Sequence, residues 1–240
     1  MSERVTIRDP AQAPLLLRFH DELYVPAFAP RQREALATWH ARLFAPAPPY
    51  QLAIVLAGAE LDDAAGARLD GGIVCERYPA SGCAILTYLV VAPAARRRGL
   101  ARGLLDGVRA ELAGARALFA EVIDPRRCPP AEADEAWARL GRFQRWGARV
   151  VDHPYVQPRL VGGEPRDRGL VLIAFVDEPA PPTLDGAIIA AFLREFYAVT
   201  EGAPPDRDPE LAAVLATVPA AVPLCALGHP SAGPGPADAG

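Results

Sequence analysis

The sequence predicts an α/β fold in which helices cover a mixed β-sheet, and three observations support this prediction. Runs rich in β-branched and aromatic residues alternate with segments whose apolar residues recur at helical spacing. Residues 83–112 have the pattern of a strand, a tight loop and a helix. Two final strand-like runs follow each other without a helix between them, which indicates a mixed sheet. With 240 residues, of which 51% are apolar, the chain can bury a substantial core.

The first part of the chain predicts a short strand, two helices and two further strands. Residues 5–8 are expected to form the first strand. Residues 12–24 and 30–44 carry leucines and aromatic residues at the spacing of helices. Residues 51–57 and 72–76 are short apolar runs separated by the turn-prone stretch GAELDDAAGARLDG, so they are expected to be strands.

The second part continues the alternation after the strand, loop and helix at residues 83–112. Residues 115–124 predict a strand, and residues 132–146 predict a helix with several aromatic residues on one face. Residues 149–155 and 170–176 then predict the final two strands of the sheet.

Three parts of the chain are expected from these patterns. Residues 1–178 form the α/β domain. Residues 179–218 form a helical extension packed on it, because residues 183–199 are strongly amphipathic and residues 210–218 favour one more helix. Residues 219–240 have the Pro/Gly/Ala composition of a flexible tail.

Charge and composition exclude several classes of protein. A formal net charge of −4 argues against nucleic acid as a partner, because neutralising phosphates needs a basic surface. No apolar run approaches the roughly 18 residues of a membrane span, and the N-terminus lacks the apolar core of a signal peptide, so a cytoplasmic protein without a membrane partner is expected. The four cysteines are widely spaced, which indicates neither a metal site nor a disulfide framework.

The loop Arg96-Arg97-Arg98-Gly99-Leu100-Ala101 stands directly between a strand and a helix and is suited to hold a phosphate. The first N–H groups of a helix have no internal partners and carry the positive end of the helix dipole. Gly99 removes the side chain that would keep a phosphate away from the backbone, and the three arginines add positive charge. A basic helix start that is merely solvated is the alternative interpretation.

At this loop the chain resembles the GNAT family of acyltransferases. The family signature is Gln or Arg, two residues, Gly, one residue and then Gly or Ala, after a strand that ends in Val-x-Pro. Val91-Ala92-Pro93 and Arg96-x-x-Gly99-x-Ala101 match both halves at this spacing. The order of predicted elements also matches over roughly residues 3–177. The resemblance implies a mostly antiparallel, splayed central sheet flanked by helices, to which this chain adds an extra C-terminal helix.

The resemblance further implies an N-acyltransferase that moves an acyl group directly from acetyl-CoA or another acyl-CoA to a primary amine, in a ternary complex and without a metal. The expected acceptor is a small molecule or a lysine- or ornithine-type side chain of a peptide, and the expected protein is a monomer or homodimer. By family analogy, the amide near Val91 holds the oxyanion that forms during transfer. The residues expected to contact coenzyme A are Leu89, Val90 and Val91 along the pantetheine arm, and Arg96, Arg97, Arg98, Gly99, Leu100 and Ala101 around the pyrophosphate.

The groups that move protons depart from the family pattern. In many members a tyrosine on the helix before the penultimate strand protonates the departing thiolate, in a context like Phe-Tyr-x-x-x-Gly. Aligned on Gly147, this chain has Phe143 at that position. Alternation along the motif strand puts Ile85, Thr87 and Leu89 on the acceptor face, where none of them is ionisable.

Other residues are therefore candidates for the catalytic roles. Glu121 lies near the end of the strand beside the motif strand and is either a base or amine anchor with a raised pKa, or a solvated or salt-bridged glutamate. His153, Tyr155 and Gln157 would share one face of the penultimate strand and form a wall of the acceptor pocket, with Tyr155 as the replacement acid. An edge strand that carries two prolines is the alternative.

The substrate side is expected to include Tyr24, Phe28, Thr87 and Gln157. Tyr24 and Phe28 lie between the first two helices, a region that commonly borders the acceptor site in this family, although aromatic packing explains them equally well. Two rival functions are open on the same fold. One is a catalytically weak CoA-binding sensor or partner-binding module, and the other is a long-chain acyl or aminoacyl transferase. A P-loop nucleotide site is excluded because the chain has no lysine.

Overall fold

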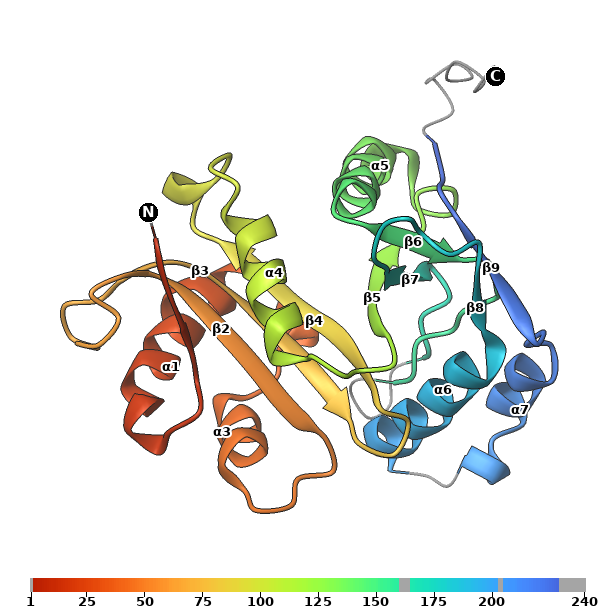
Figure 1. Ribbon diagram of the computed structural model, residues 1–240, viewed down its shortest axis with the longest axis horizontal. Coiled ribbons are helices and arrows are strands. Elements are labelled where there is room, and N and C mark those ends of the chain that lie inside the picture. Colours follow the sequence, from red (N-terminus) through yellow and green to blue (C-terminus); the bar gives the residue numbers. More distant parts are fainter. Residues whose placement is uncertain (1, 160–164, 203–204, 229–240) are drawn as a thin grey trace.

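A nine-stranded sheet forms the centre of the computed structural model, which describes residues 2–159, 165–202 and 205–228 (Figure 1). Neighbouring strands are antiparallel except for β4 and β5, which are parallel. The order across the sheet is β1 (Glu3–Thr6), β2 (Gln51–Ala59), β3 (Arg68–Tyr78), β4 (Cys83–Val91), β5 (Leu118–Ile123), β7 (Leu170–Phe175), β6 (Ala148–Val151), β9 (Ala221–Cys225) and β8 (Thr183–Asp185). The predicted mixed, mostly antiparallel sheet is confirmed.

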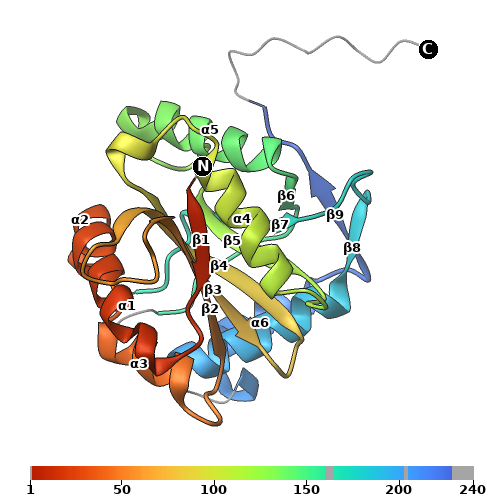
Figure 2. The same cartoon turned by 60° about the vertical axis from the view of Figure 1, so that its left-hand side comes forward.

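Helices cover both faces of this sheet. One face is covered by α4 (Leu100–Glu111) and α5 (Pro130–Arg145). The opposite face is covered at the N-terminal end by α1 (Ala13–Phe19), α2 (Val25–Ala27) and α3 (Leu36–Phe44), with a π-helical turn between α1 and α2. Its other end is covered by α6 (Gly186–Glu201) and α7 (Pro209–Ala216). Figure 2 shows the sheet nearly edge-on, with α1 to α3 on one side and α4 on the other.

Alternation along β5 explains why this strand is buried on both faces. Leu118, Ala120 and Val122 join the apolar core under α4 and α5, whereas Phe119 joins the core under α6. Successive side chains of a strand point to opposite faces, so Glu121 lies on the α6 side. The strand thereby brings a carboxylate into the apolar interior on the α6 side of the sheet.

A β-bulge in β4 changes which side chains share a face. Val74 pairs with Tyr88 and Cys75 pairs with Leu86, so Thr87 is the extra residue. Leu86 and Leu89 consequently both contact the core under α4 and α5, whereas Ile85 is buried in the core under α6. The expectation that Ile85, Thr87 and Leu89 share the acceptor face is therefore wrong, because the bulge reverses the alternation.

Several predicted boundaries are corrected by the structure. The strand predicted at 149–155 ends at Val151, since the prolines that follow lack the N–H a sheet ladder needs. The helix predicted at 30–44 begins at Leu36. The helix predicted at 183–199 begins at Gly186, where the Asp185 side chain caps it, and residues 183–185 form β8 instead.

The C-terminal part also differs from the expected flexible tail. Residues 221–225 form β9, which pairs with both β6 and β8. That part of the prediction is wrong because Val222 and Leu224 join the core under α6. Residues 229–240 lie outside the described residues. Within the described ranges, none of the helices combines the length and apolar character needed to cross a membrane.

Candidate functional site

The start of α4 presents an open backbone to solvent. Gly99 is the N-cap, with a φ of +76° and no side-chain capping bond, and no atom of the described residues lies within 4 Å of the position a Cβ would take. Arg97 also has a positive φ of 63°. The unpartnered N–H groups of the first turn therefore face free space beside three exposed arginines. This geometry fits an anionic phosphate group.

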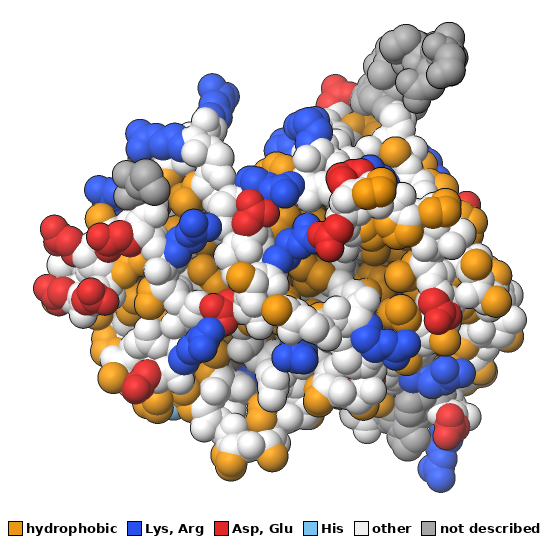
Figure 3. Space-filling model, in the orientation of Figure 1, with side chains coloured by type: hydrophobic (Ala, Val, Ile, Leu, Met, Phe, Trp, Pro, Cys, Tyr) orange, Lys and Arg blue, Asp and Glu red, His pale blue; other side chains and the backbone are white. Residues whose placement is uncertain are grey.

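A cavity of about 890 Å³ leads from this loop into the sheet. Pairing between β4 and β5 covers only the residues from Ala84 to Leu86 on β4, so the two strands part beyond that point and leave the β4 edge unpaired (Figure 1). On the face shown in Figure 3, the surface is hollowed between the segment before α4 and α5, and arginine side chains surround the hollow. Lining residues from the predicted cofactor set are Leu89, Val90, Val91, Arg96, Arg97, Gly99, Leu100 and Ala101.

Arg98 is the one predicted cofactor residue that does not line this cavity. It is exposed, and its charge adds to the lowering of the pKa of Asp70, which is caused mainly by the hydrogen bond from Arg68. Four residues of α5 and its C-cap line the cavity although the sequence analysis gave them no role there: Glu135, Arg139, Arg142 and Trp146. Phe143 lies beside them, where it contacts Trp146 edge-on with ring centroids 5.5 Å apart.

Glu121 lines the inner part of the cavity, between β4 and β5. Its carboxylate accepts hydrogen bonds from the Tyr155 hydroxyl and from Gln157 Nε2, the latter at 2.7 Å. Burial raises the pKa of Glu121 to about 7, and the two hydrogen bonds oppose this rise. A carboxylate with this pKa can accept a proton near neutral pH.

Tyr155 lies behind Glu121 rather than in the cavity. It is only 6% exposed, and its hydroxyl donates to Glu121. Burial raises the pKa of Tyr155 well above its usual range. The hydroxyl thus holds the carboxylate, and the site does not present it to a substrate in the way the replacement-acid hypothesis requires.

His153 does not join Tyr155 and Gln157. Its Nε2 atom lies 3.1 Å from Thr217 Oγ1, beyond α7. The chain leaves the sheet after Val151, so the strand alternation that would have put all three side chains on one face no longer applies. The expected three-residue wall is therefore wrong for His153.

The predicted substrate residues divide between the cavity and the core. Phe28 and Thr87 line the cavity, together with Gln32. The Thr87 hydroxyl donates to the carbonyl of Val74 at 3.0 Å. Tyr24 is fully buried and packs against Tyr88 with ring centroids 4.8 Å apart, so its role is aromatic packing behind Phe28.

A second buried carboxylate, Glu76 on β3, was missed by sequence reasoning. It is 6% exposed and accepts a hydrogen bond from the Tyr78 hydroxyl. Burial, followed by the charges of Glu34 and Glu121, raises its pKa to about 8. A signal existed in the sequence, because alternation with the apolar Val74 and Tyr78 already placed Glu76 on an inward face.

Comparison with known proteins agrees with this geometry. Residues 16–127 match the sequence model of the acetyltransferase (GNAT) family. No curated protein matches the chain. A Bacteroides thetaiotaomicron protein assigned to the GNAT family aligns with 72% of this chain and 87% of its own, at 18% identity and a TM-score of 0.53. A GNAT-family protein from Desulfovibrio desulfuricans aligns with 72% of this chain and 98% of its own, at 22% identity and a TM-score of 0.48.

The matched segment contains β4, the loop before α4, and Glu121. The family match agrees with two features of the structure, the parting of β4 from β5 and the open start of α4. Residues 16–127 of this chain are therefore similar to the GNAT family of acetyltransferases.

Proposed function

We propose that the protein is an acyl-CoA-dependent N-acyltransferase that transfers an acyl group, acetyl in the first instance, directly to a primary amine. The observation that carries the proposal is one cavity lined by an open helix start and by a carboxylate of raised pKa. These are the two ends that a ternary complex of acyl-CoA and amine requires.

The residues around the cavity fit the cosubstrate. Main-chain N–H groups from Gly99 to Ala101 would hold the pyrophosphate, while Arg96 and Arg97 add charge at the cavity wall. The β4 edge from Leu89 to Val91, which has no partner in β5, is available for the pantetheine arm. Bound acyl-CoA supplies a thioester carbon for the amine to attack and a thiolate as leaving group.

Glu121 is the proposed base. Two described lining residues are carboxylates, and Glu135 lies on α5, where it pairs with Arg139 at 2.9 Å. Glu121 instead lies where β4 and β5 part, and a pKa of about 7 lets it take a proton from the attacking amine at neutral pH. Phe143 brings no hydroxyl to the cavity, so the family tyrosine has no counterpart at that position.

The acceptor is proposed to be a small-molecule amine or a lysine- or ornithine-type side chain of a peptide. Phe28, Gln32 and Thr87 line the cavity where this amine would enter. Glu121 lines the cavity and carries a negative charge when it is ionised, which favours a cationic group over an anionic one.

Glu121→Gln tests this function. It keeps the size of the side chain but removes the basic oxygen, so kcat should fall by at least about 100-fold. The Kd of coenzyme A, measured by calorimetry, should change by less than about twofold, because Glu121 is remote from the phosphate loop. Thiol release from a series of acyl-CoA donors, assayed against a panel of amines and peptides, gives the rate.

Glu135→Gln is the matched control and should keep the wild-type kcat. An unchanged kcat in Glu121→Gln removes Glu121 from the mechanism. The presence of Phe143 also supports a second candidate, a CoA-binding sensor without efficient turnover. Tight coenzyme A binding with slow acetyl-CoA hydrolysis and no acceptor in the panel would favour that function, whereas turnover with a longer acyl donor would favour the long-chain alternative.

A further inference from the structure

The two donors that hold Glu121 come from a segment that is anchored to the C-terminal helices. Tyr155 and Gln157 lie between β6 and β7, on either side of Val156. The Val156 carbonyl accepts a hydrogen bond from the hydroxyl of Tyr197, which is on α6. The Gln157 N–H donates to the carbonyl of Asp167 at 2.8 Å, so the two described ends of the segment are joined.

Arg166 fastens this segment to α6 and α7. Its side chain is 6% exposed, and its guanidinium lies 4.8 Å from the centre of the Tyr197 ring. It pairs with Glu201 at 2.7 Å and with Glu210 at 2.9 Å, and it also pairs with Asp208, the N-cap of α7. A buried guanidinium with several carboxylate partners is a satisfied and geometrically specific arrangement.

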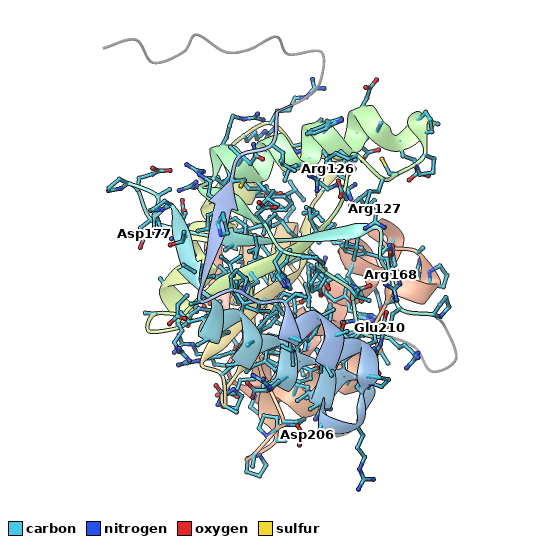
Figure 4. All side chains as sticks on the ribbon, turned by 90° about the vertical axis from the view of Figure 1, so that its right-hand side faces the viewer. Arg126, Arg127, Arg168, Asp177, Asp206 and Glu210 are labelled. Carbon is cyan, nitrogen blue, oxygen red and sulfur yellow. The ribbon has the colours of Figure 1, made fainter. Side chains whose placement is uncertain are left out.

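The view in Figure 4 shows where this connection reaches the surface. Arg168 and Glu210 lie next to each other where the chain before β7 meets α7, and the two residues form an ion pair. Arg168 is 63% exposed, in contrast to Arg166 beneath it. Arg166 is buried and pairs with three carboxylates, whereas Arg168 is exposed and pairs with Glu210.

We propose that Arg166 and Tyr197 are positioning residues for acyl transfer, which hold Tyr155 and Gln157 against Glu121 and so keep the carboxylate aimed into the cavity. The inference rests on the proposed function of Glu121 as base. It makes α6 and α7, which follow the residues expected to form the acyltransferase domain, a part of the active site.

The groups around Glu121 determine how its pKa would change if this support were lost. Glu76 and Tyr78 from β3, Tyr155 and Asp167 from the β6–β7 segment, and Tyr197 from α6 all act on or respond to its carboxylate. Tyr155 and Gln157 both donate hydrogen bonds to the Glu121 carboxylate, and these bonds lower its pKa. If the donors withdraw, burial acts unopposed, the pKa of Glu121 rises, and the base is protonated up to a higher pH.

The experiment measures kcat/KM against pH for the full chain and for two variants. Tyr197→Phe removes one hydroxyl, and Arg166→Gln removes the charge at similar length. Both should move the acidic limb of the profile up by about half to one pH unit, and activity at pH 7 should fall by about twofold to fivefold. Activity should recover at higher pH, and the Kd of coenzyme A should stay at the wild-type value.

Arg168→Gln is the matched control, since it removes an exposed ion pair with the same Glu210, and its profile should follow the wild type. Arg166→Lys should recover part of the shift, because it keeps the charge without the planar fork. A wild-type profile in folded Tyr197→Phe and Arg166→Gln overturns the proposal. If circular dichroism shows that Arg166→Gln does not fold, Tyr197→Phe alone decides.

Failure of this inference is distinguishable from failure of the proposed function. Should Glu121→Gln retain full activity, Glu121 is not the base, whatever the Arg166 variants show. Should Glu121→Gln be inactive while Tyr197→Phe and Arg166→Gln keep the wild-type profile, the base assignment stands and only the positioning role is wrong.

Discussion

Gly99 illustrates how much of the chemistry depends on a single residue. Its φ of +76° strains any other L-residue, and its missing side chain leaves the first turn of α4 open. The proposed proton transfer likewise depends on one residue, Glu121. Its raised pKa follows from burial, and its orientation follows from the two donors that hold it.

Gly99→Glu should lower the affinity for coenzyme A by at least about tenfold, which corresponds to about 1.4 kcal/mol. The added carboxylate places negative charge beside the proposed pyrophosphate site. Calorimetry with coenzyme A checks this. Gly114→Glu is the control, because Gly114 also has a positive φ, of 85°, with no atom within 4 Å of a Cβ, but lies at the far end of α4. Near-native affinity in Gly99→Glu would contradict the phosphate site.

Helix α6 is an integral element of the core. Phe192 is completely buried and packs against Phe119 of β5, with ring centroids 4.6 Å apart, and stacks on Phe196 at 5.3 Å. Glu195 accepts hydrogen bonds from the N–H groups of Ala80 and Ser81 in the turn between β3 and β4. Helix α6 thus covers the face of the sheet from which Glu121 projects.

Phe192→Ala should reduce the free energy of unfolding by about 3–5 kcal/mol, because it leaves a cavity between α6 and the sheet. Urea denaturation should show one cooperative transition with an unchanged m-value. Leu17→Ala, at a position that is 44% exposed, should cost much less. A separate early transition in Phe192→Ala would show that α6 unfolds independently of the sheet, contrary to this expectation.

At the scale of the whole molecule, two carboxylates whose pKa is raised by burial make stability depend on pH. Folding raises the pKa of Glu76 from 4.5 to about 8 and that of Glu121 from 4.5 to about 7. Between pH 4.5 and the raised pKa of each group, the folded protein keeps a proton that the unfolded chain releases. Stability therefore falls as the pH rises through this window, by at most about 1.4 kcal/mol per pH unit for each group.

Glu76→Gln should flatten this dependence. The amide is neutral throughout, so one of the two contributions to the slope between pH 5 and pH 8 disappears. The free energy of unfolding, measured by urea denaturation at pH 5, 6, 7 and 8, gives this slope. Glu135→Gln, whose side chain is exposed on α5, should keep the wild-type slope. An unaltered slope in Glu76→Gln would mean that Glu76 titrates alike in the folded and unfolded chains.

Features that depend on a few consecutive residues could be predicted from the sequence. The open loop before α4 was predictable because the strand end at Val91, Pro93 and Gly99 follow one another within a short stretch. Placement of Glu121 beside the motif strand followed from the same local order. Boundaries failed where tertiary pairing decided them, as in β9, whose residues have a composition typical of a tail but pair with β6 and β8.

The sequence by itself therefore determined the similarity to the GNAT family, the open helix start and the position of the candidate base, because backbone geometry and strand alternation are set largely by neighbours along the chain. Only the tertiary structure decided that Tyr155 supports Glu121, that His153 points to Thr217, and that Arg166 joins Glu201 and Asp208. These contacts connect residues 34 to 64 positions apart. Such pairs form only when packing brings distant segments together, and spacing along the sequence carries no record of that packing.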